Sequence, residues 1–133
     1  MAGKIIADQI EHSTAGSLDT SYVVNGSAKA WCNLNGTTFG NRAGLNVASN
    51  TDNGTGDYTT TFTSAMNDAN YATVDGSIDS VSNQTRGTVL SAASFTHTTS
   101  SYRRYYNLTQ SAGDGVFGYD VNNVMQAVFG DLA

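Results

Sequence analysis

The residues of this chain that could do chemistry are a few carboxylates, two histidines and one cysteine. Asp52 and Asp57 enclose an Asn- and Gly-rich loop that offers oxygen ligands for calcium, but the EF-hand spacing and its terminal Glu are absent. Asp75 and Asp79 could form a carboxylate pair for glycoside hydrolysis. A structural turn explains the first pair better, and solvated charge in a polar loop explains the second.

A nucleophilic site would have to combine residues that lie far apart in the sequence. The histidines are His12 and His97, and the single cysteine, Cys32, falls on the core face of an expected strand. A Cys-His or Ser-His-Asp site would need several coincidences. One cysteine can form neither an internal disulfide nor a cysteine pair for a metal ion. We therefore predict a non-enzymatic protein with no cofactor and no metal site.

The strongest binding-like feature is a cluster of aromatic and basic residues at positions 102–106. In a strand, Tyr102, Arg104 and Tyr106 share one face, while Arg103 and Tyr105 share the other. Tyrosine can stack on sugars or fill a protein pocket, and arginine can bind carboxylates or phosphates in a bidentate manner. The alternative is that one face is core or subunit interface and the other is ordinary surface. The sequence leaves both interpretations open.

The clearest structural element near these candidates is a β-hairpin. Its expected turn contains the Asn-Gly pair Asn53 and Gly54, which favours positive φ. Strand-favouring residues alternate on both sides of this turn, so we expect Leu45–Ser49 to pair with Asp57–Phe62.

Further strands are expected along the rest of the chain. In the strand Ser27–Asn35, the core face is formed by Ala28, Ala30, Cys32 and Leu34. Trp31 then lies on the outer face, against a second sheet or another subunit. Other strands are expected at 39–49, 71–78, 87–99, 102–109 and 119–129. This spacing predicts an antiparallel β-sandwich, with helix confined to the first dozen residues if it occurs at all.

The N-terminal segment is expected to be an arm separate from the sandwich. It groups three apolar residues, Ile5, Ile6 and Ile10, before a polar connector that runs to residue 21. Its periodicity fits a short helix or a strand-like segment equally well. We predict an attachment arm and connector at 1–21, with Ile5, Ile6 and Ile10 as docking residues, and a sandwich domain at 22–133.

Composition indicates an oligomer and excludes two classes of partner. Only 39% of the chain is hydrophobic, and Ser, Thr, Asn and Gly supply nearly half of it. So thin a core in a short chain favours burial between subunits. The sequence pI near 4.5 argues against nucleic acid. No apolar run is long enough to span a membrane, and the N-terminus lacks the pattern of a secretory signal.

Several segments resemble a module of tail-fibre proteins from tailed bacteriophages, especially those of marine phages and cyanophages. The resemblance runs from Asp19 to Tyr71. It is carried by Asp19–Trp31, by Thr51–Thr59 and by the Ala65-Met66 and Asn70-Tyr71 pairs, and the closing Val128–Asp131 is similar to the end of such proteins. These are strand and turn positions, so they imply a fold and a biological setting but no catalytic residues.

The resemblance implies a virion protein that assembles as a homotrimer. The first expectation is a short tail fibre or receptor-binding adhesin that contacts a host surface glycan or protein, with the arm docked to other virion proteins. Trp31 and positions 102–106 are then candidates for receptor or subunit contacts. A capsid decoration or cement protein is the alternative, favoured by the small size. A polysaccharide-degrading tail spike is a weaker one.

Overall fold

The computed structural model describes residues 3, 5–78, 96–108 and 117–133. Strands dominate these residues and one short helix accompanies them, which confirms the predicted all-β class. The elements are β1 (Gln9–His12), β2 (Gly16–Asp19), α1 (Thr20–Gly26), β3 (Ala30–Asn35), β4 (Gly40–Leu45), β5 (Val47–Gly54), β6 (Asp57–Phe62), β7 (Ala72–Ile78), β8 (Thr96–His97), β9 (Ser101–Tyr105), β10 (Asn107–Leu108), β11 (Phe117–Gly118) and β12 (Asn123–Phe129). Most of the strand expected at 87–99 lies outside the described residues.

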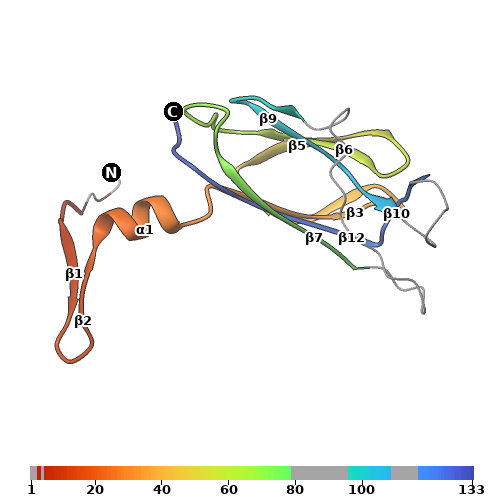
Figure 1. The fold of residues 1–133 in the computed structure, drawn as a ribbon. Coiled ribbons are helices and arrows are strands. Elements are labelled where there is room, and N and C mark those ends of the chain that lie inside the picture. The colour runs from red at the N-terminus through yellow and green to blue at the C-terminus, as the bar shows by residue number, and fades with distance from the viewer. Residues whose placement is uncertain (1–2, 4, 79–95, 109–116) are drawn as a thin grey trace.

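Two four-stranded antiparallel sheets form the body of the protein (Figure 1). The first sheet has the order β4-β3-β12-β7, and the second has the order β5-β6-β9-β8. Two clusters of buried apolar side chains fill the space between them. One contains Ala30, Phe62, Met66, Tyr71, Tyr102 and Val128, and the other contains Leu34, Tyr58, Tyr106, Val121 and Val124. Because each cluster takes residues from both sheets, burial of these side chains holds the sheets together.

The expected hairpin is present as β5 and β6, but its turn lies two residues later than predicted. Gly54 pairs with Asp57, so Thr55 and Gly56 form the turn. Gly56 has φ +74°, and its N–H donates to Asp120 Oδ1 at 2.7 Å. A Cβ on Gly56 would stand 2.4 Å from the Tyr106 carbonyl oxygen. This close approach and the positive φ explain why position 56 of the turn is a glycine.

The strand expected at 39–49 is in fact two strands in different sheets. Leu45 of β4 pairs with Trp31 in the first sheet, whereas Val47 of β5 pairs with Phe62 in the second. Asn46, between them, has φ +55° and turns the chain from one sheet to the other. Its side chain accepts from Ser64 N and donates to Ser64 O, at 2.7 and 3.0 Å. The prediction that Leu45 belongs to the hairpin was therefore wrong.

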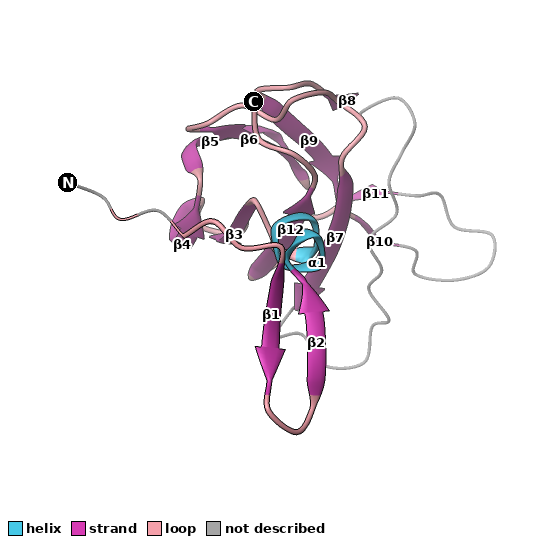
Figure 2. Cartoon of the chain, turned by 90° about the vertical axis from the view of Figure 1, so that its left-hand side faces the viewer, coloured by secondary structure: helices cyan, strands magenta, loops and turns pink. Residues whose placement is uncertain are grey.

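The N-terminal residues form a hairpin and a helix that project from the body (Figure 1). Among the described residues, strand β1 pairs with β2 alone, and Figure 2 shows this hairpin extending clear of both sheets. The helix α1 follows directly, with Asp19 as its N-cap, and it contains no buried residue. Helix was predicted only in the first dozen residues, and this prediction was wrong. We define the arm as residues 5–26, because α1 also lies outside the two sheets.

Candidate functional site

Strand β9 divides the tyrosine and arginine cluster into two sets. Tyr102, Arg104 and Tyr106 are buried between the sheets, whereas Arg103 and Tyr105 lie on the opposite side of the strand and are partly exposed. This is the predicted alternation, and the buried set belongs to the core. Of the five candidates, Arg103 and Tyr105 are therefore the two that a ligand could reach in this structure.

Arg104 places its guanidinium inside the body, with 0% of the residue exposed. It donates to Thr60 Oγ1 at 2.7 Å and to Gln126 Oε1, and its Nη2 lies 3.5 Å from Cys32 Sγ. Its Cζ also stands 5.9 Å from the centroid of the Tyr102 ring. Thr60 is in the second sheet and Gln126 is in the first, so Arg104 links the two sheets between the apolar clusters.

A second polar group connects the same two sheets. The Tyr102 hydroxyl donates to Asp75 Oδ2 at 2.5 Å, and the His97 ring lies 5.0 Å from the Tyr102 ring. Burial raises the pKa of the Asp75 carboxyl, while the hydrogen bond from Tyr102 opposes this change. Burial lowers the pKa of His97, and the nearby Asp75 charge opposes that effect. Because Tyr102 is fully buried, we interpret the group as structural. Asp79, the other half of the proposed carboxylate pair, is outside the described residues.

Arg103 forms an ion pair that accounts for one of the calcium-loop candidates. Its Nε and Nη2 donate to the two oxygens of Asp57 at 2.9 and 2.5 Å. This hydrogen bonding lowers the pKa of the Asp57 carboxyl, against the effect of burial. Asp52 Oδ1 accepts from Gly54 N at 2.9 Å, and Asn53 Nδ2 donates to Asp57. Both carboxylates are thus used within the second sheet, Asp52 inside the hairpin and Asp57 in its pair with Arg103 of β9, as expected of a structural turn.

The outward side of the first sheet carries a row of apolar residues across all four strands. Trp31 lies opposite Leu45 on one side and Ala127 on the other. Ala127 in turn lies opposite Val74, which is 64% exposed. Trp31 is on the outer face as predicted and is 39% exposed. Further apolar residues of β7 and β12 have the same orientation. We give the name outer apolar face to six residues of this side: Trp31, Leu45, Val74, Ile78, Met125 and Ala127.

Most residues of this face were not predicted from the sequence, because the apolar residues of β7 face away from the core. Its apolar positions, Val74 and Ile78, point outward, while Thr73, Asp75 and Ser77 alternate with them on the core side. A strand covered on one side normally shows the opposite arrangement. The alternation of apolar and polar residues in β7 was therefore visible in the sequence. Which side of the strand faces the core was not.

The arm exposes every large apolar side chain that the structure describes in it. The set comprises Ile5, Ile6, Ile10, Leu18, Tyr22, Val23 and Val24. Ile10 and Leu18 are cross-strand partners, so they form a pair on one side of the hairpin. Ile5, Ile6 and Ile10 were the predicted docking residues, and Ile5 is 94% exposed. Sequence reasoning did not include the residues of β2 and α1.

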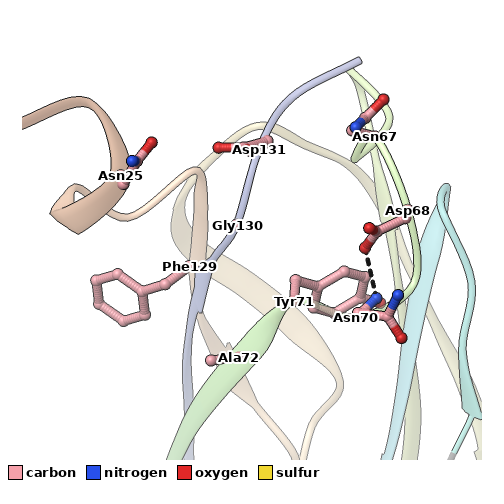
Figure 3. Close-up of a pocket in the computed structure, with 9 residues that line it drawn as sticks. All are labelled: Asn25, Asn67, Asp68, Asn70, Tyr71, Ala72, Phe129, Gly130 and Asp131. Atoms are coloured by element: carbon pink, nitrogen blue, oxygen red, sulfur yellow. Dashed lines mark hydrogen bonds between the residues drawn. The ribbon is translucent and has the colours of Figure 1, made fainter. Parts of the chain in front are cut away.

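A pocket of about 360 Å³ lies where the arm joins the body (Figure 3). Its lining residues are Asn25, Asn67, Asp68, Asn70, Tyr71, Ala72, Phe129, Gly130 and Asp131. Much of the lining is engaged internally, since Asn70 N donates to Asp68 Oδ1 and Asn67 N donates to Asp131 O, each at 2.7 Å. Lys29 Nζ donates to the Val24 and Ser27 carbonyl oxygens at the end of α1. These contacts fix the point at which the arm leaves the body.

Within the described ranges, no group of three or more His, Cys, Asp or Glu residues is placed to hold a metal ion. In the same part of the chain, no helix is both long enough and apolar enough to cross a membrane. Comparisons of the chain with protein-family models, curated proteins and solved structures find no match. Function must therefore be inferred from the arm, the outer apolar face and the residues of β9.

Proposed function

We propose that this chain is a non-enzymatic structural protein of a phage particle, acting as a short tail fibre or receptor-binding adhesin. The observation that carries the proposal is the arm, which projects from a well-packed body and exposes all of its described large apolar residues. Such residues are suited to docking on a larger assembly. The phage setting comes from the tail-fibre resemblance between Asp19 and Tyr71. In this proposal Ile5, Ile6 and Ile10 attach the chain to other virion proteins.

The body is proposed to be a β-sandwich that works as a homotrimer. The exposed apolar side chains of the arm, together with Trp31, Leu45 and Val74 on the outward side of the first sheet, support association between copies. The three-fold symmetry comes from the resemblance. Light scattering on the purified chain tests the trimer, and a concentration-independent monomer would contradict it.

Host contact is proposed to involve the accessible side of β9. Arg103 and Tyr105 offer a cation and an aromatic hydroxyl on one surface, which suits a surface glycan or an acidic protein segment. Arg103 is already paired with Asp57, so it is held in place before any ligand arrives. Trp31 is on a different surface, the outward side of the first sheet, and suits contact with a protein better.

The role in the particle is tested by copy number and position. Quantitative mass spectrometry of purified particles of the phage that encodes this chain should find a few to tens of copies, and antibody labelling should place them at the tail. Purified protein should also compete with particles for adsorption to host cells. Absence of the chain from particles would overturn the proposal.

A capsid decoration or cement protein is the second candidate. The small body with one lateral arm favours it, because an arm can reach a neighbouring capsomer. Hundreds of copies distributed over the head would support this role over the fibre. A polysaccharide-degrading spike remains the weakest alternative, since Asp75 is bound to the buried Tyr102 hydroxyl. Release of reducing sugar from host surface glycan would revive it.

A further inference from the structure

The arm contains structure that is too small to be stable without a covering partner. An isolated two-stranded hairpin is marginal in water, and helices shorter than about 12–15 residues rarely persist alone. Here β1 and β2 pair only with each other, and α1 has seven residues, none of them buried. The Ile10 and Leu18 pair gives the hairpin one apolar side. The arm therefore needs an apolar surface to cover that side.

The outer apolar face is a surface of the matching kind on the same chain. Strand β12 is largely apolar on both sides, with Val124 and Val128 in the core and Met125 and Ala127 facing outward. Strands with this pattern are typical of sheets that are covered on both sides. In the described structure the second sheet covers one side of the first sheet, and the outward side keeps Val74 64% exposed.

The charges of the two surfaces are complementary. Residues 5–26 include Asp8, Glu11 and Asp19 but no lysine or arginine, which gives the arm net negative charge. The outward side of the first sheet carries Arg42, whose Nη1 donates to Asn33 Oδ1 and Asn123 Oδ1 at 3.4 and 2.5 Å. The outward strand positions of this sheet hold no carboxylate in the part of the chain that the structure describes. A negatively charged arm is attracted to this side of the body.

We propose that the outer apolar face binds the N-terminal arm of a second copy of this chain, with Ile10 and Leu18 packed against Trp31 and Val74. The arm points away from its own body (Figure 1), so the contact forms between copies. Because different surfaces meet, the contact is head-to-tail, and a closed ring has one such contact per chain.

This inference goes beyond the adhesin role and does not depend on it. It changes one assignment of that role: Ile10 contacts a second copy of the chain, and Ile5 and Ile6 remain for docking to the particle. The proposal requires a head-to-tail contact. A symmetric contact between two outer apolar faces would instead give a dimer in which the arm takes no part.

The first test places a charge on each surface of the full-length chain. Leu18→Lys on the arm and Val74→Lys on the outer apolar face should each convert the assembly to monomer in analytical ultracentrifugation. The matched controls are Ser17→Lys, on the other side of the hairpin, and Thr51→Lys, on exposed strand β5. They add the same charge, and we expect them to leave the assembly unchanged. Both altered side chains are exposed, so the body should remain folded by circular dichroism.

The decisive test mixes the two defective variants. The Leu18→Lys chain keeps an intact outer apolar face, and the Val74→Lys chain keeps an intact arm. A head-to-tail contact therefore predicts a one-to-one heterodimer in native mass spectrometry, and no larger complex. A mixture that stays monomeric would overturn the proposal, as would an oligomer that persists in Leu18→Lys. If the oligomer persists in Leu18→Lys, the proposed trimer would still be supported, but the arm would not form the contact between copies.

Discussion

The body buries Leu34, Val124 and Val128 completely, whereas the arm leaves all of its described large apolar side chains exposed to solvent. Both regions are continuous in sequence and similar in composition. The difference is in partners: β3 and β12 of the first sheet bury one side against the second sheet, while among the described residues β1 and β2 pair only with each other. Apolar residues in the body therefore stabilise the chain itself. Those in the arm can stabilise only an assembly.

The body also contains buried polar side chains that bond to one another across the two sheets, whereas α1 in the arm contains no buried residue. Arg104 bonds to residues of both sheets, and the Tyr102 hydroxyl bonds to Asp75 across the same space. Such networks help to fix one arrangement of two sheets. The arm uses exposed contacts instead, such as the cap at Asp19 and the bonds from Lys29 to the end of α1. Substitutions should therefore have large effects in the body and small ones in the arm.

The largest expected difference is between two aliphatic truncations. Leu34→Ala removes a fully buried side chain from the core, and we expect it to lower the free energy of unfolding by about 2–5 kcal/mol. Ile6→Ala, at a position that is 82% exposed, should change it by less than about 0.5 kcal/mol. Urea unfolding of both variants measures the difference. Equal losses would mean that the arm is part of the folding unit.

The next largest expected difference in stability is between substitutions at two glycines with positive φ, one in the body and one in the arm. In Gly56→Ala the new Cβ would stand 2.4 Å from Tyr106 O and 2.7 Å from Tyr119 N, and φ is +74°. We expect at least about 1–3 kcal/mol of destabilisation of the body from the backbone strain alone. Gly16→Ala in the arm has φ +93° but nothing within 4 Å. It should disturb the hairpin and leave the thermal midpoint of the body unchanged in dilute protein, where the copies are separate. A lowered midpoint in Gly16→Ala would contradict this separation.

Structural features that depend on the local residue pattern were predicted from the sequence. Features that depend on which elements a strand packs against were missed. Alternation correctly placed Ala30, Cys32 and Leu34 in the core and Trp31 outside, because β3 has one buried side. The pattern of β7 could not show that Val74 faces outward, since alternation fixes two faces but not which one is covered. The change of sheet at Asn46 was missed for a related reason: it depends on bonds to Ser64, far away in sequence.

A smaller effect is expected from the ion pair on the body. Hydrogen bonds from Arg103 lower the pKa of Asp57, so the pair contributes stability above the ordinary aspartate pKa and loses it as the pH falls through the lowered value. Arg103→Gln should cost about 0.2–1 kcal/mol at neutral pH, because Arg103 is 39% exposed. That difference from the unaltered chain should disappear at acidic pH. A Lys4→Gln variant, which also removes one positive charge, controls for the change in net charge. A pH-independent effect of Arg103→Gln would exclude the ion pair as its cause.

Burial of Asp75 predicts that the stability of the body falls as the pH rises, which is the opposite of the effect expected from the Arg103 and Asp57 pair. Its pKa is raised by burial, so its ionisation opposes folding as the pH rises from the ordinary aspartate pKa towards the raised value. Asp75→Asn keeps an acceptor for the Tyr102 hydroxyl and removes the titrating group. The loss of stability over that pH range should therefore be smaller in the variant, as measured by thermal melts. An unchanged profile would show that Asp75 does not titrate differently in the folded chain.

The smallest effect on the body is expected from the helix cap in the arm. Asp19 Oδ1 accepts from Ser21 N at 2.9 Å, and this bond lowers the pKa of the carboxyl. Asp19→Ala removes the acceptor, so the amides of α1 should exchange faster with solvent while the thermal midpoint of the body stays the same. Asp19→Asn keeps a good capping group and should restore slow exchange. If α1 is covered by a second copy, the faster exchange should be seen only in dilute protein, where the copies separate. Faster exchange at every concentration would show that association does not protect the helix, and it would limit the contact between copies to the hairpin.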